Sequence, residues 1–202
     1  MKRLLLSAVL LFSTLAHAED DYSFRAAYGQ VTKNDFLEIL VGQIQPHRYD
    51  LKVLAFDGGY LLKQNAFDLP LDLYAKAGVA HFDERGLQDD IYEGTLYLKL
   101  YWNIDFLDNR ARLGLGEGGS YTTDILYAEY LEAIEKNGKN SKYLNYMDVS
   151  IDLDIGKLVQ YEPLHGTSIG FALKHRSGIY GLVNNVRRGG SNYYTVYLET
   201  NF

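Results

Sequence analysis

One histidine and one serine in the 202-residue sequence stand at a spacing that suits nucleophilic catalysis. In the segment 167–178, TSIGFALKHRSG, His175 precedes Ser177 by two residues. Side chains two residues apart on a β-strand share a face, and their Cα atoms lie about 7 Å apart. At that separation an imidazole can serve as the general base of a serine hydroxyl. The alternative interpretation is a polar rim at the depth of lipid headgroups, because His-x-Ser is a common tripeptide.

The residues before this pair indicate the face that it occupies. Ile169, Phe171 and Leu173 are apolar and odd-numbered, so odd positions face lipid if this segment crosses a membrane. His175 and Ser177 continue the same row. Polar groups on a lipid-facing wall are costly, and a purely structural protein has little reason to place them there.

Long alternating runs predict the strands that must position the pair. Apolar and polar residues alternate through 70–82, 92–105 and 143–155. Strands of soluble proteins usually have about five or six residues, whereas a tilted transmembrane strand needs about nine to eleven. The 28 aromatic residues, 18 of them Tyr, suit the interfacial girdles of such a protein. The sequence predicts an all-β fold, an eight-stranded antiparallel transmembrane β-barrel of the outer membrane; a periplasmic β-sandwich is the alternative.

The strands can be assigned by counting back from the C-terminus. Downward strands are expected at 49–63, 90–105, 143–157 and 192–202, and upward strands at 70–82, 110–123 and 167–178. The first upward strand comes from 22–45, where 22–32 and 36–45 are both candidates. The long segments 124–142 and 179–191 are expected outside the cell. A short helix is expected in the first of them, with Asp124 as N-cap and Gly138 after its end; a partly ordered loop is the alternative.

The N-terminus has the pattern of an export signal. Lys2 and Arg3 precede an apolar run from Leu4 to Leu15, and an A-x-A cleavage pattern follows at 16–18. This predicts a signal peptide over 1–18, a barrel over 19–202 and a place in the outer membrane of a Gram-negative bacterium. The absence of Cys excludes disulfides and a Cys nucleophile, and the net charge of −6 argues against nucleic-acid binding. No cofactor is implied, and the row Asp148, Asp152, Asp154 is expected to line a wet lumen rather than bind a metal.

The segment FALKHRSGIYG, followed by a last alternating strand, resembles the C-terminal end of the PagL-type lipid A 3-O-deacylases. The resemblance implies that Ser177 is the nucleophile and His175 the general base for hydrolysis of an acyl ester of lipid A. The family has Asn after the Ser and a glycine two residues later, whereas this chain has Gly178 and then Gly181. Gly178 and Gly181 are the expected oxyanion-hole glycines. Asn185 or its neighbour Asn184 corresponds to an Asn of the family in the following loop.

The main departure from the family concerns the acid. The family has a Glu at the start of the final strand, ten residues before the end, and that position here is Asn192. No Asp or Glu occurs between Pro163 and Leu198. An Asn can orient a His by accepting its N–H, as in Cys-His-Asn proteases. Either Asn192 orients His175, or the protein is a weakened or non-hydrolytic relative.

Four basic residues lie in the same acid-free window. These are Lys174, Arg176, Arg187 and Arg188, and they are expected to hold lipid A phosphates beside the pair. The sequence therefore predicts a lipid A deacylase-like esterase whose partners are lipopolysaccharide and outer-membrane lipids. The alternative is a non-catalytic structural or adhesive barrel that contacts lipopolysaccharide through the same basic rim. A pore is disfavoured, because side chains largely fill an eight-stranded lumen.

Overall fold

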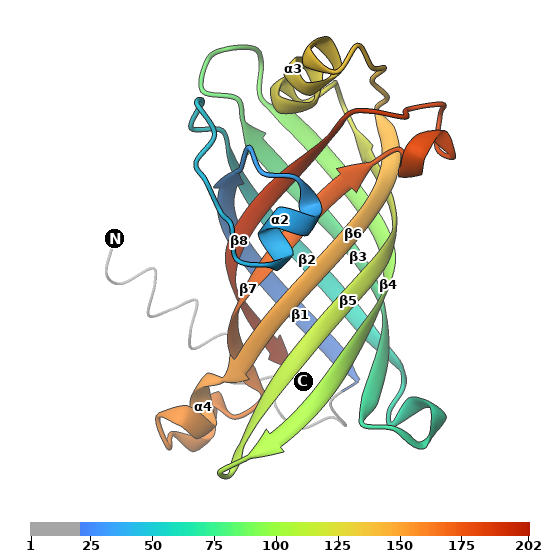
Figure 1. Cartoon of the computed structure of the whole chain (residues 1–202). Helices are drawn as coiled ribbons and strands as arrows, with labels where there is room; N and C mark the ends of the chain where they lie inside the picture. The colour runs from blue at the N-terminus through green and yellow to red at the C-terminus, as the bar shows by residue number, and fades with distance from the viewer. Residues whose placement is uncertain (1–20) are drawn as a thin grey trace.

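The computed structural model describes residues 21–202, which form a closed barrel of eight antiparallel strands (Figure 1). Each strand pairs with its sequence neighbours, and β8 pairs with β1 to close the barrel. The predicted fold class is confirmed; the predicted signal peptide over 1–18 lies outside the described residues. The strands are β1 (Tyr22–Val31), β2 (Lys52–Lys63), β3 (Leu71–Asp83), β4 (Ile91–Phe106), β5 (Asn109–Thr122), β6 (Tyr143–Asp154), β7 (Thr167–Ser177) and β8 (Gly190–Asn201).

The alternation in the sequence separates an apolar outer wall from a polar lumen. On β4, Leu96 and Leu98 are 70% and 53% exposed, whereas Tyr97 and Lys99 between them are almost completely buried. The other strands repeat this pattern, so a belt of exposed apolar side chains surrounds the barrel. Such a belt is the surface that a membrane-spanning barrel presents to lipid. Among the described residues, no helix is long and apolar enough to cross a membrane.

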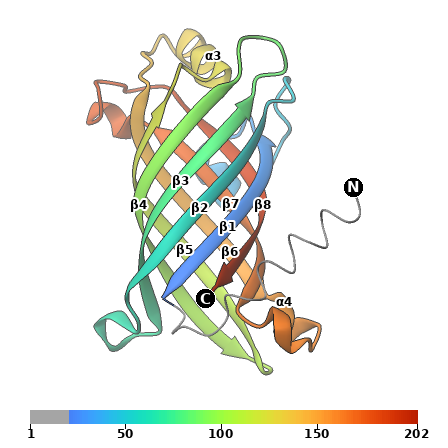
Figure 2. The same cartoon turned by 180° about the vertical axis from the view of Figure 1, so that it is seen from behind.

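The two rims of the barrel differ in the length of their connections. One rim carries the start of β1, the C-terminus and the shorter turns (Figures 1 and 2). There the N–H of Tyr22 donates to the carbonyl of Phe202. Those turns contain η1 (Ala66–Asp68), α4 (Ile155–Leu158) and η2 (Glu162–Leu164). The other rim carries longer loops with α2 (Phe36–Leu40), α3 (Tyr127–Glu135) and η3 (Ile179–Gly181). In this class of barrel the short turns are periplasmic and the long loops extracellular.

The first upward strand is β1, within the candidate range 22–32. The other candidate, 36–45, is not a strand: it contains α2, which lies on the outside of the wall (Figure 1). The Glu38 side chain accepts the N–H of Asp35 at 3.1 Å, which stabilises the first turn of this helix. The chain therefore leaves the barrel after β1, folds over its outer surface and returns at β2.

Two other boundaries differ from the prediction. The strand expected over 143–157 ends at Asp154, because the Asp154 carboxylate accepts the N–H of Lys157 at 2.9 Å and begins α4. The helix expected after Asp124 begins at Tyr127, and its N-cap is Leu126. Glu84, from the β3–β4 loop, accepts the N–H of Tyr127 at 3.1 Å and so supplies the cap from another part of the chain. Gly138 follows the helix, as predicted.

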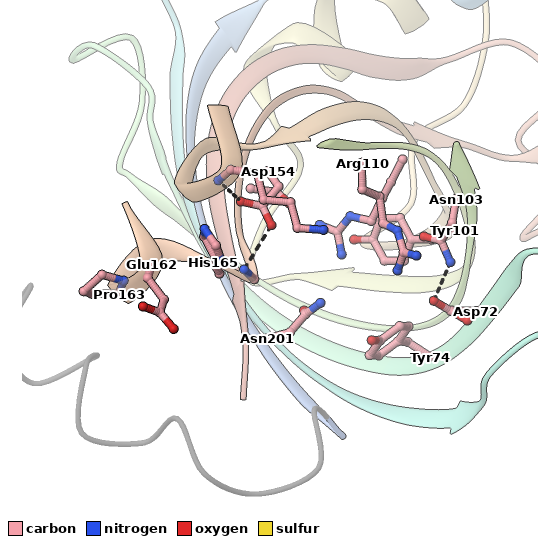
Figure 3. A pocket seen from close by; sticks show the side chains of 14 residues that line it. Asp72, Tyr74, Tyr101, Asn103, Arg110, Asp154, Glu162, Pro163, His165 and Asn201 are labelled. Atoms are coloured by element: carbon pink, nitrogen blue, oxygen red, sulfur yellow. Dashed lines mark hydrogen bonds between the residues drawn. The ribbon is translucent and has the colours of Figure 1, made fainter. Parts of the chain in front are cut away.

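The middle of the lumen is filled by paired charges and tyrosines. Arg25 contacts Asp57 at 3.0 Å and Asp148 at 2.9 Å, and Lys99 pairs with the same Asp148. Toward the rim of short turns the lumen widens into a polar cavity of about 620 Å³. Figure 3 looks into this cavity, where Asn103 donates to Asp72 at 2.6 Å. The cavity thus lies at the opposite end of the barrel from the His175–Ser177 pair.

Candidate active site on the outer wall

Strand β7 places His175 and Ser177 on its outer face, near the extracellular rim. Lys174 and Arg176, which alternate with them, point into the lumen and are 5% and 1% exposed. In the register of the sheet His175 stands opposite Asn192 on β8, and Ser177 stands opposite Gly190. The alternation in the sequence was therefore sufficient to identify the face.

Asn192 accepts a hydrogen bond from His175, which is the contact required by the first of the two alternatives that the sequence left open for this residue. Nδ1 of His175 lies 2.6 Å from Oδ1 of Asn192, and Nδ2 of Asn192 donates to the backbone carbonyl of Asn34 at 2.9 Å. A carbonyl only accepts, so the Asn34 carbonyl requires the amide nitrogen of Asn192 on its side. The amide oxygen must then face His175, and Nδ1 carries the proton. Nε2 is left with the lone pair that a general base needs.

The loop that carries α2 also covers the ring of His175. The rings of Phe36 and His175 are 4.8 Å apart between centroids, at an angle of 44°. Leu173, two residues earlier on the same outer face, is only 5% exposed, whereas Phe171 is 65% exposed. The outer face of β7 is therefore exposed at Phe171 and covered by the α2 loop beside His175.

Asn34 holds this loop in shape through its side chain. Its Oδ1 accepts the N–H of Gln45 at 2.7 Å, and its Nδ2 donates to Glu38 at 3.0 Å. The side chain is buried, so these bonds are protected from competition with water. The backbone carbonyl that fixes Asn192 is thus held by a closed network within residues 34–45.

No hydrogen bond joins His175 to Ser177 among the residues that the structure describes. Neighbouring outward positions on one strand keep the two side chains roughly parallel, and the imidazole is turned toward Asn192. Ser177 is half-buried and is the last residue of β7. Catalytic hydrogen bonds are often long in a site without substrate, so the missing bond does not by itself exclude the pair.

Several backbone N–H groups of the loop after Ser177 have no hydrogen-bond partner within residues 21–202, and that of Gly178, directly after the serine, is among them. The predicted role of Gly181 is not supported, because its N–H donates to the Gly178 carbonyl at 3.0 Å and is used within the turn. Asn184 donates to Ser141 and to the Tyr143 carbonyl, both at 2.9 Å. Asn185 is exposed in the same loop.

The expected phosphate contacts of Lys174 and Arg176 are wrong. Lys174 lies 2.5 Å from Glu93 inside the lumen, and Arg176 contacts Glu93 at 3.2 Å and Glu129 of α3 at 2.7 Å. The segment 163–198 itself contains no carboxylate, but Glu93 of β4 and Glu129 of α3 meet the two basic side chains inside the barrel. Side chains so buried and paired cannot reach a lipid on the outer wall. Arg187 and Arg188 are exposed and remain candidates for phosphate binding.

The sequence prediction missed the contribution of the first long loop. Phe36 lies about 140 residues before the histidine that it contacts, and Asn34 lies 158 residues before Asn192, whose side chain it holds. Asp35 and Glu38, at the spacing of a helix start, were the available signal that this segment is not a strand. Nothing in the sequence shows that the resulting helix folds back onto the barrel wall.

Comparisons with known proteins agree on the fold. No protein-family model matches the sequence, and no curated protein matches it either. The structure is similar to that of the outer membrane enzyme PagL, with a TM-score of 0.58 and 12% identity over 89% of this chain and 99% of that one. It is also similar to Neisserial surface protein A (NspA), with a TM-score of 0.50 and 9% identity over 91% of this chain and 98% of that one. At these identities the likenesses show an eight-stranded barrel of the outer-membrane type.

Proposed function

We propose that this protein is a lipid A 3-O-deacylase-like esterase that is exported by the signal peptide 1–18 and acts in the outer leaflet. The observation that carries the proposal is the hydrogen-bonded chain from the Asn34 carbonyl through Asn192 to Nδ1 of His175. It leaves Nε2 of a histidine unprotonated on the lipid-facing side of a barrel, two residues from a serine on the same face. A purely structural wall has no need of such an arrangement.

The reaction would be a two-step acyl transfer. Nε2 of His175 takes the proton of Ser177 as Oγ attacks the ester carbonyl, and the Gly178 N–H donates to the oxyanion, with the Asn185 side chain as the second donor. Collapse of this intermediate breaks the bond to the sugar oxygen, which receives the proton from His175. Water then attacks the acyl-serine with His175 again as base; the bond between the acyl group and Oγ breaks, Oγ receives the proton from His175, and the hydroxy fatty acid leaves.

Arg187 and Arg188 would hold the substrate at this position. Both are exposed in the loop that follows Ser177. A guanidinium binds phosphate oxygens through paired N–H donors, and lipid A carries phosphates on its sugars. Their place above the lipid-facing wall suits a headgroup whose acyl chains lie lower, beside Ser177.

A non-catalytic barrel that contacts lipopolysaccharide is the second candidate. Asn192 in place of an acid favours it, because an amide stabilises an imidazolium less than a carboxylate does. The similarity to a surface protein as well as to an enzyme is compatible with both functions.

Lipid A from a Gram-negative host that expresses the protein will decide between the two candidates. The enzyme predicts the loss of one hydroxyacyl chain in the mass spectrum, and Ser177→Ala should restore the original mass. Ser168→Ala is the matched control, since Ser168 is on the same strand but points into the lumen and is 6% exposed. Unchanged lipid A from a host that contains the folded wild-type barrel would exclude the deacylase.

A further inference from the structure

Apolar side chains continue above the barrel wall on the loop that covers His175. The segment 36–44, which contains α2, reads FLEILVGQI. Of its apolar residues, Ile39 alone is buried. Leu37, Leu40, Val41 and Ile44 are 73%, 49%, 74% and 48% exposed. The charge of Glu38 is directed back to Asn34 and to the N–H of Asp35. An exposed apolar cluster of this kind marks a surface that contacts something other than water.

The loop after Ser177 carries a second exposed apolar group. Tyr180 and Leu182 are 93% and 84% exposed. The backbone of Ile179 and Tyr180 is left-handed, with φ of 46° and 54°, which is unfavourable for a β-branched residue. A strained turn that holds an aromatic ring away from the protein is a feature found at binding sites.

The two groups stand on either side of the upper end of β7. Figure 1 shows α2 against the wall on one side of that end and η3 on the other, and Figure 2 shows the same arrangement from behind. Ser177 lies between them, since it immediately precedes the η3 loop and is two residues from the histidine that Phe36 covers. The exposed belt below them is apolar too, with Phe171 on β7 at 65% and Val196 on β8 at 48% exposure.

We propose that the segment 36–44 and the residues Tyr180 and Leu182 are immersed in the outer leaflet, where they bind the acyl chains of a membrane lipid on both sides of Ser177. The continuity of both groups with the apolar belt identifies lipid as the occupant. Short amphipathic segments of this kind bury their apolar side chains about 5–10 Å into the boundary between headgroups and acyl chains. This inference concerns lipid contact and holds whether or not Ser177 is a nucleophile.

Tryptophan fluorescence in lipid vesicles tests the depth of each segment. The full chain with Trp102→Phe, which removes the only Trp, is the background. Leu40→Trp and Leu182→Trp report on the two segments, and Ile134→Trp on α3, 60% exposed at the same rim, is the control in water. The vesicles contain phosphatidylcholine with or without bromine on the upper part of its acyl chains, because bromine quenches only a nearby indole. All four positions are at the surface, and a heat-dependent shift in gel mobility verifies that each variant is folded.

Lipid immersion predicts that bromine quenches Leu40→Trp and Leu182→Trp several-fold more strongly than Ile134→Trp. Equal, weak quenching of all three would place both segments in water and overturn the proposal. A blue-shifted emission that bromine does not quench would mean that protein, such as a second copy of the chain, covers the segments, and this also overturns it. Quenching at only one of the two positions would overturn the two-sided arrangement around Ser177.

Discussion

At the scale of single residues, Asn192 shows how an amide can orient a histidine. A carboxylate accepts hydrogen bonds on both oxygens, whereas an amide has one accepting and one donating end. The donating end is held by the Asn34 carbonyl at 2.9 Å, so the accepting end is directed to His175 at 2.6 Å. The ring is oriented by geometry alone, without the charge that would stabilise its protonated form.

Replacing Asn192 by Leu should therefore affect the histidine more than the barrel. We expect Asn192→Leu to lower kcat by about 100-fold or more, since a positioned general base contributes about that much. Nitrogen NMR should show His175 with the proton on Nδ1 in the wild type and a mixture of the two tautomers in the variant. His165, in the turn at the opposite rim, is an internal reference whose signals should not move. An unchanged His175 spectrum would contradict the orienting role.

The limits of prediction from sequence are clear at this scale. His175, Ser177 and Asn192 could be placed because a period of two fixes their face and because β7 and β8 are consecutive. Asn34 and Phe36 could not, since the contacts of Asn34 with β8 and of Phe36 with β7 depend on how a loop folds in three dimensions. The positive charges of Lys174 and Arg176 suggest lipid ligands, but the same period of two places these even-numbered residues in the lumen, where they are buried.

At the scale of elements, α3 is held by a cap that comes from another loop. Its own N-cap, Leu126, has no side-chain hydrogen bond, and Glu84 supplies the acceptor for Tyr127. A carboxylate at a helix N-terminus is favourable, but Glu84 is completely buried. Burial raises the pKa of Glu84 from 4.5 to about 7, the Tyr127 N–H opposes this rise, and the nearby Glu129 carboxylate adds to it.

The raised pKa predicts that the packing of α3 depends on pH. In the closed form α3 is packed on the barrel and Glu84 is buried; in the open form α3 is detached and Glu84 is in water. Between pH 4.5 and 7 the closed form keeps a proton on Glu84 that the open form releases. The closed form therefore becomes less stable as the pH rises through this range. The equilibrium constant for opening increases by up to roughly tenfold per pH unit, and it is constant above pH 7. Hydrogen exchange of the α3 amides, corrected for the intrinsic rate, measures this. Glu84→Gln should remove the dependence; a dependence that persists in this variant would assign it to another group.

The strands were the most predictable elements and the short helices the least. Each strand is ten or more residues long and repeats one rule, so chance alternation is improbable over that length. Helix α2 has five residues, which is too few to show a period or to form by itself. It exists because Asn34, Glu38 and Gln45 tie the loop together, and such a network is visible only in the fold.

At the scale of the whole molecule, the barrel is held from inside by charges. Asp148 is 1% exposed and contacts both Arg25 and Lys99. Asp148→Asn should destabilise the barrel by about 3–5 kcal/mol, because it leaves the buried Lys99 without a counter-charge and Arg25 with Asp57 alone. Unfolding by urea in lipid vesicles measures the loss.

Asp105 provides the matched control for this prediction. It pairs with Arg110 at 2.6 Å, but its side chain is 65% exposed. Asp105→Asn should cost no more than about 1 kcal/mol, since water replaces an exposed ion pair. Equal effects of the two substitutions would mean that the lumen is hydrated and that burial does not strengthen its pairs.

The ion pairs of the lumen also have a consequence for how the chain assembles. Arg25 is on the first strand and Asp148 on the sixth, 123 residues apart, and Lys76 of the third strand meets Glu199 of the last at 2.8 Å. An unfinished sheet would expose one half of each pair to the hydrocarbon interior. Partly inserted intermediates are therefore penalised, and the chain should enter the membrane in a single concerted closure that begins only after synthesis of its last strand.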